Sequence, residues 1–258
     1  MIGLIGGSGF YDTAMLKKTE QKKVHTPFGA TSDLVTTGEF EEKKIAFIPR
    51  HGAKHSINPS QVNYRANIQA MKELGVQRII AANAVGSLKE EMKPGELVIV
   101  DQFIDLTKGR KNTFYEGTQV CHISTAEPFC KELRKILIES AQKLSLPFHE
   151  KGTCIVIEGP RFSTKAESIL FKSWGADIIN MTLCPEAVLA REAEICYAAI
   201  AMVTDYDCWK DSHATGAEVV KIMKENVHKM QMLVKEAIPL IPEQRKCECK
   251  DALKSAIQ

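Results

Sequence analysis

Short apolar runs alternate along the chain with longer stretches in which apolar residues recur every three or four positions. The longest apolar run, residues 197–204, shows no polar alternation, which is typical of a strand buried on both faces. Further strands are predicted over residues 1–6, 34–37, 45–48, 78–83, 97–100, 153–157 and 176–180. Because strands and helices alternate throughout, the pattern predicts one α/β domain over residues 1–258, with a mixed, largely parallel sheet flanked by helices.

Helix boundaries are predicted from capping residues and from the helical period. Asn58 as N-cap and Pro59 at the first helical position predict a helix that Gly75 ends. Thr164 and Glu167 have the spacing of a capping box at the start of another helix. Further helices are predicted over residues 127–144, from residue 185 onward, over 217–238 and, short and amphipathic, over 243–258.

Two carboxylates, Asp205 and Asp207, end the longest apolar run. Ligands of open α/β sheets bind beyond the carboxyl ends of the strands, and residues two apart share one face of an extended chain. The two acids can therefore point into one pocket. A solvated turn, or Asp207 as the cap of the next helix, explains the same residues equally well.

Turns after other predicted strands offer donors for an anion. A glycine-rich turn can aim backbone N–H groups and the Ser8 hydroxyl at one point. Arg50 offers a planar fork and His51 a neutral or cationic donor, while Asn83 and the Ala84 N–H group are further candidates. A structural turn is the competing explanation at each place. Neither GxGxxG nor GKT/GKS is present, which argues against a dinucleotide-dependent oxidoreductase and a P-loop protein.

Composition and the amino-terminal sequence argue against a nucleic-acid-binding, secreted or membrane-spanning protein. The 258 residues are 44% hydrophobic and 26% charged, and the formal net charge of +2 gives no reason to expect nucleic acid or an anionic membrane as partner. The amino terminus lacks the basic and apolar regions of a signal peptide. No apolar stretch approaches the ~20 residues that span a bilayer. We therefore expect a cytoplasmic protein.

The eight cysteines fall into two kinds. Six are scattered without metal-ligand spacing and are expected to be buried free thiols. Cys247 and Cys249 form a CxC pair in a polar tail, which fits a strained disulfide, half of a metal site or two unpaired thiols. Because no complementary Cys or His cluster stands nearby, a zinc site is the least favoured of these, and no metal is predicted.

Several motifs occur together in a fixed order: GGSG at residues 6–9, RHG at 50–52, AVGS at 84–87, EGPRFS at 158–163, NMT at 180–182 and TDYD at 204–207. With them the chain closely resembles the methylthioadenosine phosphorylase branch of the purine nucleoside phosphorylase family, from about residue 2 to residue 239. The resemblance implies a homotrimeric or hexameric α/β pentosyltransferase that needs no cofactor. It also implies cleavage of 5′-methylthioadenosine by inorganic phosphate, which gives adenine and 5-methylthioribose 1-phosphate.

The resemblance further implies roles for residues that match the family's motifs. The phosphate contacts are Ser8, Arg50, His51, Ala84 and Thr182, with Asn83 where a threonine or serine is expected. The nucleoside contacts are Phe162, Ser163, Met181, Asp205, Asp207, Val219 and His122, the last supplied by a neighbouring subunit. The CxC tail resembles that of archaeal hyperthermophilic members, and the sequence leaves open whether disulfides join Cys130, Cys196, Cys247 and Cys249.

A mechanism follows for such an enzyme. Asp205, buried beside Asp207, is expected to have a raised pKa, to share a proton with Asp207 and to donate it to N7 of adenine as general acid. Two alternatives remain. One is a purine nucleoside phosphorylase that acts broadly on adenosine, inosine and guanosine, and the other is a non-catalytic nucleoside-binding protein, which would not need the phosphate donors.

Overall fold

The computed structural model describes residues 1–9, 15–210 and 216–258, apart from the side chains of residues 216, 217 and 219. Within these residues the strands are β1 (Ile2–Gly6), β2 (Lys17–Lys22), β3 (Val35–Phe40), β4 (Lys43–Pro49), β5 (Arg78–Ser87), β6 (Leu97–Ile99), β7 (Gln102–Asp105), β8 (Phe148–His149), β9 (Thr153–Val156), β10 (Ile178–Asn180) and β11 (Cys196–Tyr206). They form one mixed sheet in the order β2-β3-β4-β1-β5-β10-β9-β7, with β11 paired to β5 and β6, and β8 paired to β6.

The sheet is built around β5. β1 pairs with the first residues of β5 and β11 runs along its whole length, both parallel to it, whereas β10 pairs antiparallel with Gly86 and Ser87 at its end. β4 adds a further parallel strand beside β1. The predicted mixed, largely parallel sheet is therefore confirmed.

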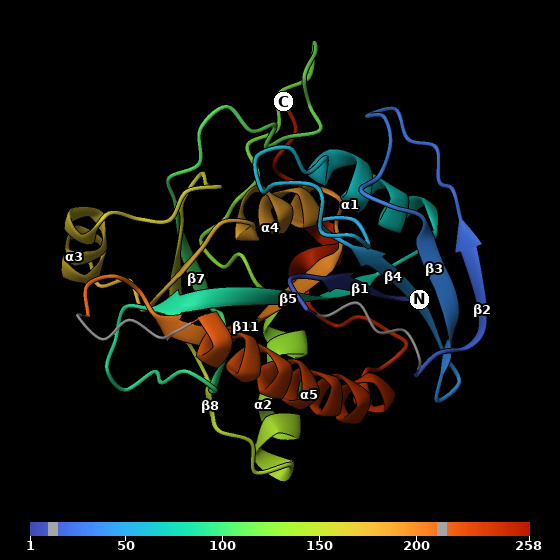
Figure 1. Cartoon of the computed structure of the whole chain (residues 1–258). Coiled ribbons are helices and arrows are strands. Elements are labelled where there is room, and N and C mark those ends of the chain that lie inside the picture. Colours follow the sequence, from blue (N-terminus) through green and yellow to red (C-terminus); the bar gives the residue numbers. More distant parts are fainter. Residues whose placement is uncertain (10–14, 211–215) are drawn as a thin grey trace.

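Helices cover both faces of this sheet. They are α1 (Tyr64–Glu73), α2 (Lys131–Lys143), α3 (Lys165–Ser173), α4 (Leu183–Glu192) and α5 (Gly216–Leu240), followed by the 3-10 turn η1 (Glu248–Asp251). α1 and α4 lie on one face, α2 and α5 on the other, and α3 stands at one end (Figure 1).

β11 shows why the longest apolar run forms a central strand. Its odd-numbered side chains from Tyr197 to Val203 enter the core cluster that also contains residues of α1 and α4. Its even-numbered side chains from Cys196 to Met202 enter the cluster that contains residues of α2 and α5. The strand is buried on both faces, as predicted, because each face is covered by a helical layer.

The predicted helix ends are correct in part. The Thr164–Glu167 capping box is present, and Gly75 follows α1 with a positive φ of 76°. The helix predicted from Asn58 begins instead at Tyr64, because Asn63 is the N-cap, its side chain accepting from the Ala66 N–H. Asn58 accepts the N–H groups of residues 60 and 61 and so closes a local turn.

The amphipathic helix predicted over residues 243–258 is wrong in its extent, since only the turn η1 forms there. The tail packs back along the body of the protein instead. Ile257 forms a β-bridge with Cys121, and the N–H of Gln258 donates to the carbonyl of Val120.

The cysteines also depart from expectation. All eight lie within the described residues and none forms a disulfide, as expected for the six scattered ones, but Cys121 and Cys208 are half-buried and not buried. Cys130 and Cys196, two of the six that look scattered in sequence, lie beside Cys247 and Cys249. The expectation that no complementary cysteine cluster stands near the CxC pair is therefore wrong, because folding joins segments more than 50 residues apart.

In the part of the chain that the structure describes, no helix is both long and apolar enough to cross a membrane.

Candidate active site

A cavity of about 790 Å³ lies at the carboxyl ends of β1, β4 and β11, beside the second half of β5. Parallel strands bring their carboxyl ends to the same edge of a sheet, where ligands of α/β proteins bind. Most residues predicted for the site line this cavity. They are Ser8, Arg50, His51, Ala84, Phe162, Ser163, Met181, Thr182, Asp205 and Asp207.

Arg50 is fully buried at the end of β4 and is held by a carboxylate that the sequence did not point to. Its Nε and Nη2 atoms donate to the two carboxylate oxygens of Glu186, each at 2.7 Å, and its Nη1 donates to the carbonyl of Ala82 at 2.9 Å. Burial acts to lower the pKa of Arg50, but the Glu186 carboxylate outweighs burial and the pKa is raised. Arg50 is therefore a permanent cation in the wall of the cavity.

The guanidinium keeps donors for a ligand. Nη1 and Nη2 each retain an N–H group that has no acceptor among the described residues, so an anion in the cavity can still be bound by two parallel hydrogen bonds. The nearby glycine turn is shaped by this side chain. A Cβ on Gly7 would lie 2.3 Å from the carbonyl oxygen of Ala82 and 2.9 Å from Nη1 of Arg50, so only glycine fits there.

His51 differs from the donor that the sequence suggested. Its Nδ1 lies 2.8 Å from the carbonyl oxygen of Ile57, and burial together with the charge of Arg50 lowers its pKa to about 4. The neutral ring therefore donates from Nδ1 to Ile57, which leaves Nε2 as an acceptor. Nε2 can therefore accept a hydrogen bond from a protonated oxygen of a ligand. The His51 backbone N–H has no acceptor among the described residues and is free to donate.

Asn83 does not line the cavity, in contrast to the prediction. It lies behind Thr182 and donates from Nδ2 to the Thr182 hydroxyl at 3.1 Å. Asn180, which the sequence analysis did not single out as a contact, holds the same turn, since its Oδ1 accepts the N–H groups of Thr182 and Leu183 at 2.6 and 2.7 Å. Both amides thus position Thr182, which itself faces the cavity.

The two acids at the end of β11 have separate hydroxyl partners. Thr204 donates to Asp205 at 2.6 Å, and the Ser163 hydroxyl lies 2.9 and 2.7 Å from the two oxygens of Asp207. Burial raises the pKa of Asp205, the charge of Asp207 raises it further, and the Thr204 hydroxyl opposes both. The raised pKa agrees with the prediction, but Asp205 is half-buried and not buried as expected, whereas Asp207 is buried. No hydrogen bond joins the two carboxyl groups among the described residues, so the predicted shared proton is not supported.

Arg110 is a second residue that the sequence analysis missed. Its Nη1 donates to the carbonyls of Met181 and Cys184 at 2.7 and 2.8 Å, and its Nε pairs with Glu158 at 3.2 Å. It thereby ties the long loop at residues 107–120 to the strand end that carries Met181. The only sequence signal was the length of that loop.

Two predicted residues lie outside this arrangement. His122 is exposed, away from the cavity lining, and its backbone N–H donates to the carbonyl of Ala256 at 2.8 Å. That His122 of one subunit reaches the site of a neighbouring subunit stays a prediction. The side chain of Val219 falls outside the described residues.

Known proteins resemble this chain over nearly its whole length. It is 59% identical over 254 residues to S-methyl-5′-thioadenosine phosphorylase of Pyrococcus furiosus, covering 98% of each chain. It is 56% identical over 256 residues to the protein of the same name from Thermofilum pendens, covering 99% of this chain and 98% of the relative.

Solved structures agree with these relatives. Methylthioadenosine phosphorylase from Schistosoma mansoni in complex with adenine has a TM-score of 0.93 at 42% identity, covering 98% of this chain and 96% of that one. A methylthioadenosine phosphorylase from an antarctic soil metagenomic library has a TM-score of 0.95 at 43% identity, covering 100% and 92%. The family model of the phosphorylase superfamily matches residues 1–239. With the sheet, the cavity and these matches in agreement, the chain belongs to the phosphorylase superfamily.

Proposed function

We propose that the protein cleaves 5′-methylthioadenosine with inorganic phosphate and releases adenine and 5-methylthioribose 1-phosphate. One observation carries the proposal: a single cavity joins a buried, charge-fixed anion site at Arg50 to a half-buried acid with a raised pKa at Asp205. The names of the relatives support the substrate, and they do not favour the broad purine nucleoside phosphorylase. Phosphate is the co-substrate, and the proposed reaction needs no cofactor.

Phosphate is proposed to lie against Arg50, with the hydroxyls of Ser8 and Thr182 and the N–H groups of His51 and Ala84 as further donors. A charged fork and fixed dipoles in a water-poor site stabilise an anion without reorganising as the reaction proceeds. Cleavage of the N-glycosidic bond builds positive charge on the ribose. A phosphate held beside C1′ stabilises that charge and then captures the sugar.

The base is proposed to lie between Phe162 and the two acids. The departing purine gains negative charge, and protonation at N7 removes it. Asp205, protonated more readily than an exposed carboxyl, donates that proton, which typically contributes ~10²–10⁴ in rate. Ser163 holds Asp207 from behind, so Asp207 can accept from the 6-amino group of adenine.

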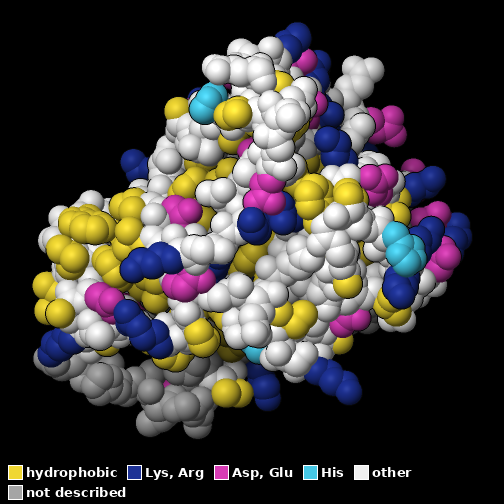
Figure 2. All heavy atoms as spheres, turned by 90° about the horizontal axis from the view of Figure 1, so that it is seen from above, with side chains coloured by type: hydrophobic (Ala, Val, Ile, Leu, Met, Phe, Trp, Pro, Cys, Tyr) yellow, Lys and Arg dark blue, Asp and Glu magenta, His cyan; other side chains and the backbone are white. Residues whose placement is uncertain are grey.

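We propose that the protein acts as a homotrimer or hexamer. Figure 2 shows hydrophobic side chains gathered at the end of the molecule that carries α3. The exposed ones in and around this helix include Ile169, Leu170 and Trp174, and Phe162 beside it is 81% exposed although it lines the cavity. A second copy of the chain would cover these side chains and close the purine side of the cavity. Light scattering of the purified protein tests the assembly.

The catalytic proposal is tested by adenine release from 5′-methylthioadenosine, with and without phosphate, beside adenosine and inosine. Phosphate-dependent release with methylthioadenosine preferred is the expected result. Release without phosphate would make the protein a hydrolase, similar rates on all three substrates would favour the broad phosphorylase, and no release would favour a binding protein.

The acid is tested by Asp205→Asn, which should lower kcat on methylthioadenosine by about 10²–10⁴ and shift relative preference toward inosine. The matched control is Asp105→Asn, a strand-end acid outside the cavity lining. Unchanged kinetics of Asp205→Asn on both substrates would refute its role.

A further inference from the structure

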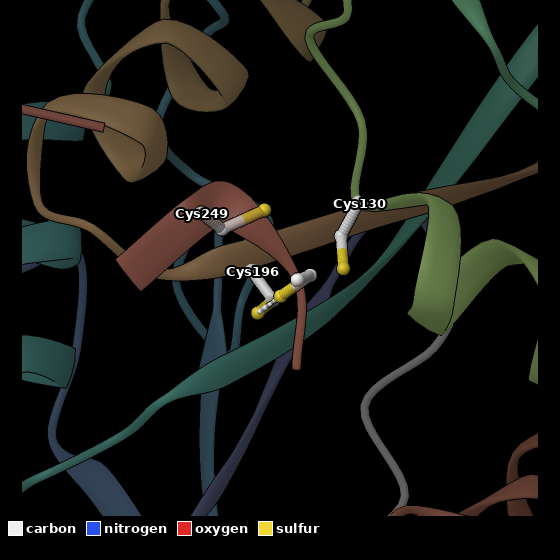
Figure 3. A group of neighbouring side chains, drawn as sticks. Cys130, Cys196 and Cys249 are labelled. Carbon is white, nitrogen blue, oxygen red and sulfur yellow. Dashed lines mark hydrogen bonds between the residues drawn. The ribbon is translucent and has the colours of Figure 1, made fainter. Parts of the chain in front are cut away.

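Four cysteines lie together at the amino end of β11, the opposite end of this strand from Asp205. Cys130 precedes α2, Cys196 is the first residue of β11, and Cys247 and Cys249 come from the tail around η1. Their sulfur atoms all lie within 4.8 Å of one another. Figure 3 shows the labelled sulfurs of Cys130, Cys196 and Cys249 converging from three separate segments.

The distances between the four sulfur atoms fit tetrahedral coordination of one metal ion. Zinc binds thiolates at roughly 2.3 Å, which places the sulfurs of a tetrahedral site about 3.8 Å apart. The Sγ atoms of Cys196 and Cys247 are 3.3 Å apart, and the largest separation in the cluster is bounded by 4.8 Å. The 3.3 Å distance must grow by about 0.5 Å, and the longest distance must shrink by at most about 1 Å, to reach the tetrahedral separation.

Two disulfides are the rival arrangement, with an S–S bond of roughly 2.05 Å in each pair. The pair at 3.3 Å, Cys196 and Cys247, is not the CxC pair, and a bond between these two would leave Cys130 and Cys249 as the second pair. Because every sulfur is near the other three, the cluster singles out no two partners. One central ion uses all four sulfurs in the same way.

The surroundings favour a charged cluster with a cation inside it. All four cysteines belong to or pack against the core between the sheet and the layer of α2 and α5, where unpaired thiolates are costly. Cys130 is the N-cap of the 13-residue α2, whose amino end favours negative charge.

We propose that Cys130, Cys196, Cys247 and Cys249 form a structural tetrathiolate site for a zinc ion. Binding exchanges the four thiol protons for one Zn²⁺, and all four ligands come from the protein, as in closed structural sites. The ion would fasten the tail to the amino end of β11, the opposite end of the strand from Asp205. Its role is therefore to hold the fold and not to act on substrate.

The tail also contacts residues 120–122, so its attachment affects a second segment. Beyond the cluster it bonds to residues 120–122, through the bridge of Ile257 with Cys121 and the bond from the His122 N–H to Ala256. Loss of the ion should therefore loosen both the tail and the loop that carries His122.

The test is metal analysis of the full chain, produced with zinc in the medium and purified without chelator or reductant under anaerobic conditions. We expect about one zinc per chain and, after denaturation with chelator but without reductant, alkylation of every cysteine. Replacing the zinc by cobalt should give the absorption of a tetrahedral tetrathiolate. Removing the ion from the native protein should lower its melting temperature and expose the tail to carboxypeptidase.

Variants assign the ligands. Cys247→Ser should weaken zinc affinity at least about tenfold, the loss that even an outer-shell partner of a metal causes. Cys121→Ser is the control, because Cys121 is half-buried and outside the cluster, and it should keep its zinc. The analysis of the unmodified protein stands even if a variant fails to fold. Absence of zinc together with only four alkylated cysteines would establish disulfides and overturn the proposal, as would a full set of free thiols that binds no added zinc or cobalt.

Discussion

The substitution Glu186→Gln probes the buried ion pair that fixes Arg50. The two side chains are 1% and 0% exposed, and the Tyr197 hydroxyl also donates to Glu186 at 2.7 Å. Glutamine keeps the shape and one acceptor oxygen, but its amide N–H groups face the Nε–H of Arg50, and the cation loses its counter-charge. Removing one partner of a buried pair typically destabilises a protein by about 3–5 kcal/mol.

For a chain of this length that loss corresponds to a fall in melting temperature of roughly 6–20 °C. Urea denaturation at fixed protein concentration measures the change, since urea, unlike guanidinium, does not screen charges. Phosphate gives a second readout. It should raise the melting temperature of Glu186→Gln more than that of the original protein, because the uncompensated Arg50 then has only the bound anion to offset it.

Glu192→Gln is the matched control on the same helix. Glu192 is also buried, but it accepts from the Thr113 hydroxyl and the Phe114 N–H and pairs with no Lys or Arg among the described residues. Glutamine can keep one of these bonds, so the loss should stay near that of a single hydrogen bond, about 1 kcal/mol. Equal losses for the two variants, or a loss below about 1 kcal/mol for Glu186→Gln, would refute the claim that charge pairing holds Arg50.

Other substitutions test the acids and the anion site. Asp205 has a raised pKa in the folded protein, so the folded state binds its proton more tightly, and stability falls as pH rises from its ordinary value of 3.8 through the raised one. Asp205→Asn should therefore melt higher than the original protein at pH 7 but not at acid pH below 3.8, and a melting series across pH checks both limits. Thr182→Val should raise the phosphate KM by about 10–100-fold, because it removes a hydrogen bond to a charged group. Asn83 lies behind the cavity, so Asn83→Thr should change the phosphate KM by less than about 3-fold. Steady-state assays measure both. Ser163→Ala should raise the nucleoside KM about tenfold with little effect on the phosphate KM, because the lost hydroxyl holds Asp207 on the purine side of the cavity. An equal rise in both KM values would contradict that separation.

Local features were predictable because their causes lie within a few residues. The burial of β11 followed from its run of apolar residues, and the start of α3 followed from the three-residue spacing of Thr164 and Glu167. The first helix was misplaced because Asn58 and Asn63 both satisfy the same rule, and only packing decides between a turn and a cap. The helix prediction for the tail failed for a related reason. The tail's cysteines point into a cluster that exists only after folding, and no local pattern reveals it.

The cavity lining was predictable in kind, since strand ends and small turns collect ligands in α/β folds. The partners of these residues were not. Glu186 lies 136 positions from Arg50, and a glutamate in the first turn of α4 looks like an ordinary helix-start acid in sequence. Arg110 lies 71 positions from Met181, in a loop without periodicity. The tautomer of His51 likewise depends on the Ile57 carbonyl, which no spacing reveals.

These hidden partners decide how the site works. A free arginine would reorient when phosphate arrives, and part of its attraction would be lost to that movement. Arg50 is already fixed, because three of its N–H groups donate hydrogen bonds to Glu186 and to the Ala82 carbonyl. Since the pair is nearly neutral as a whole, the cavity attracts phosphate mainly through directed N–H groups and not through bulk positive charge. Phosphate binding should therefore depend on geometry more than on ionic strength, which is the behaviour of a preorganised site.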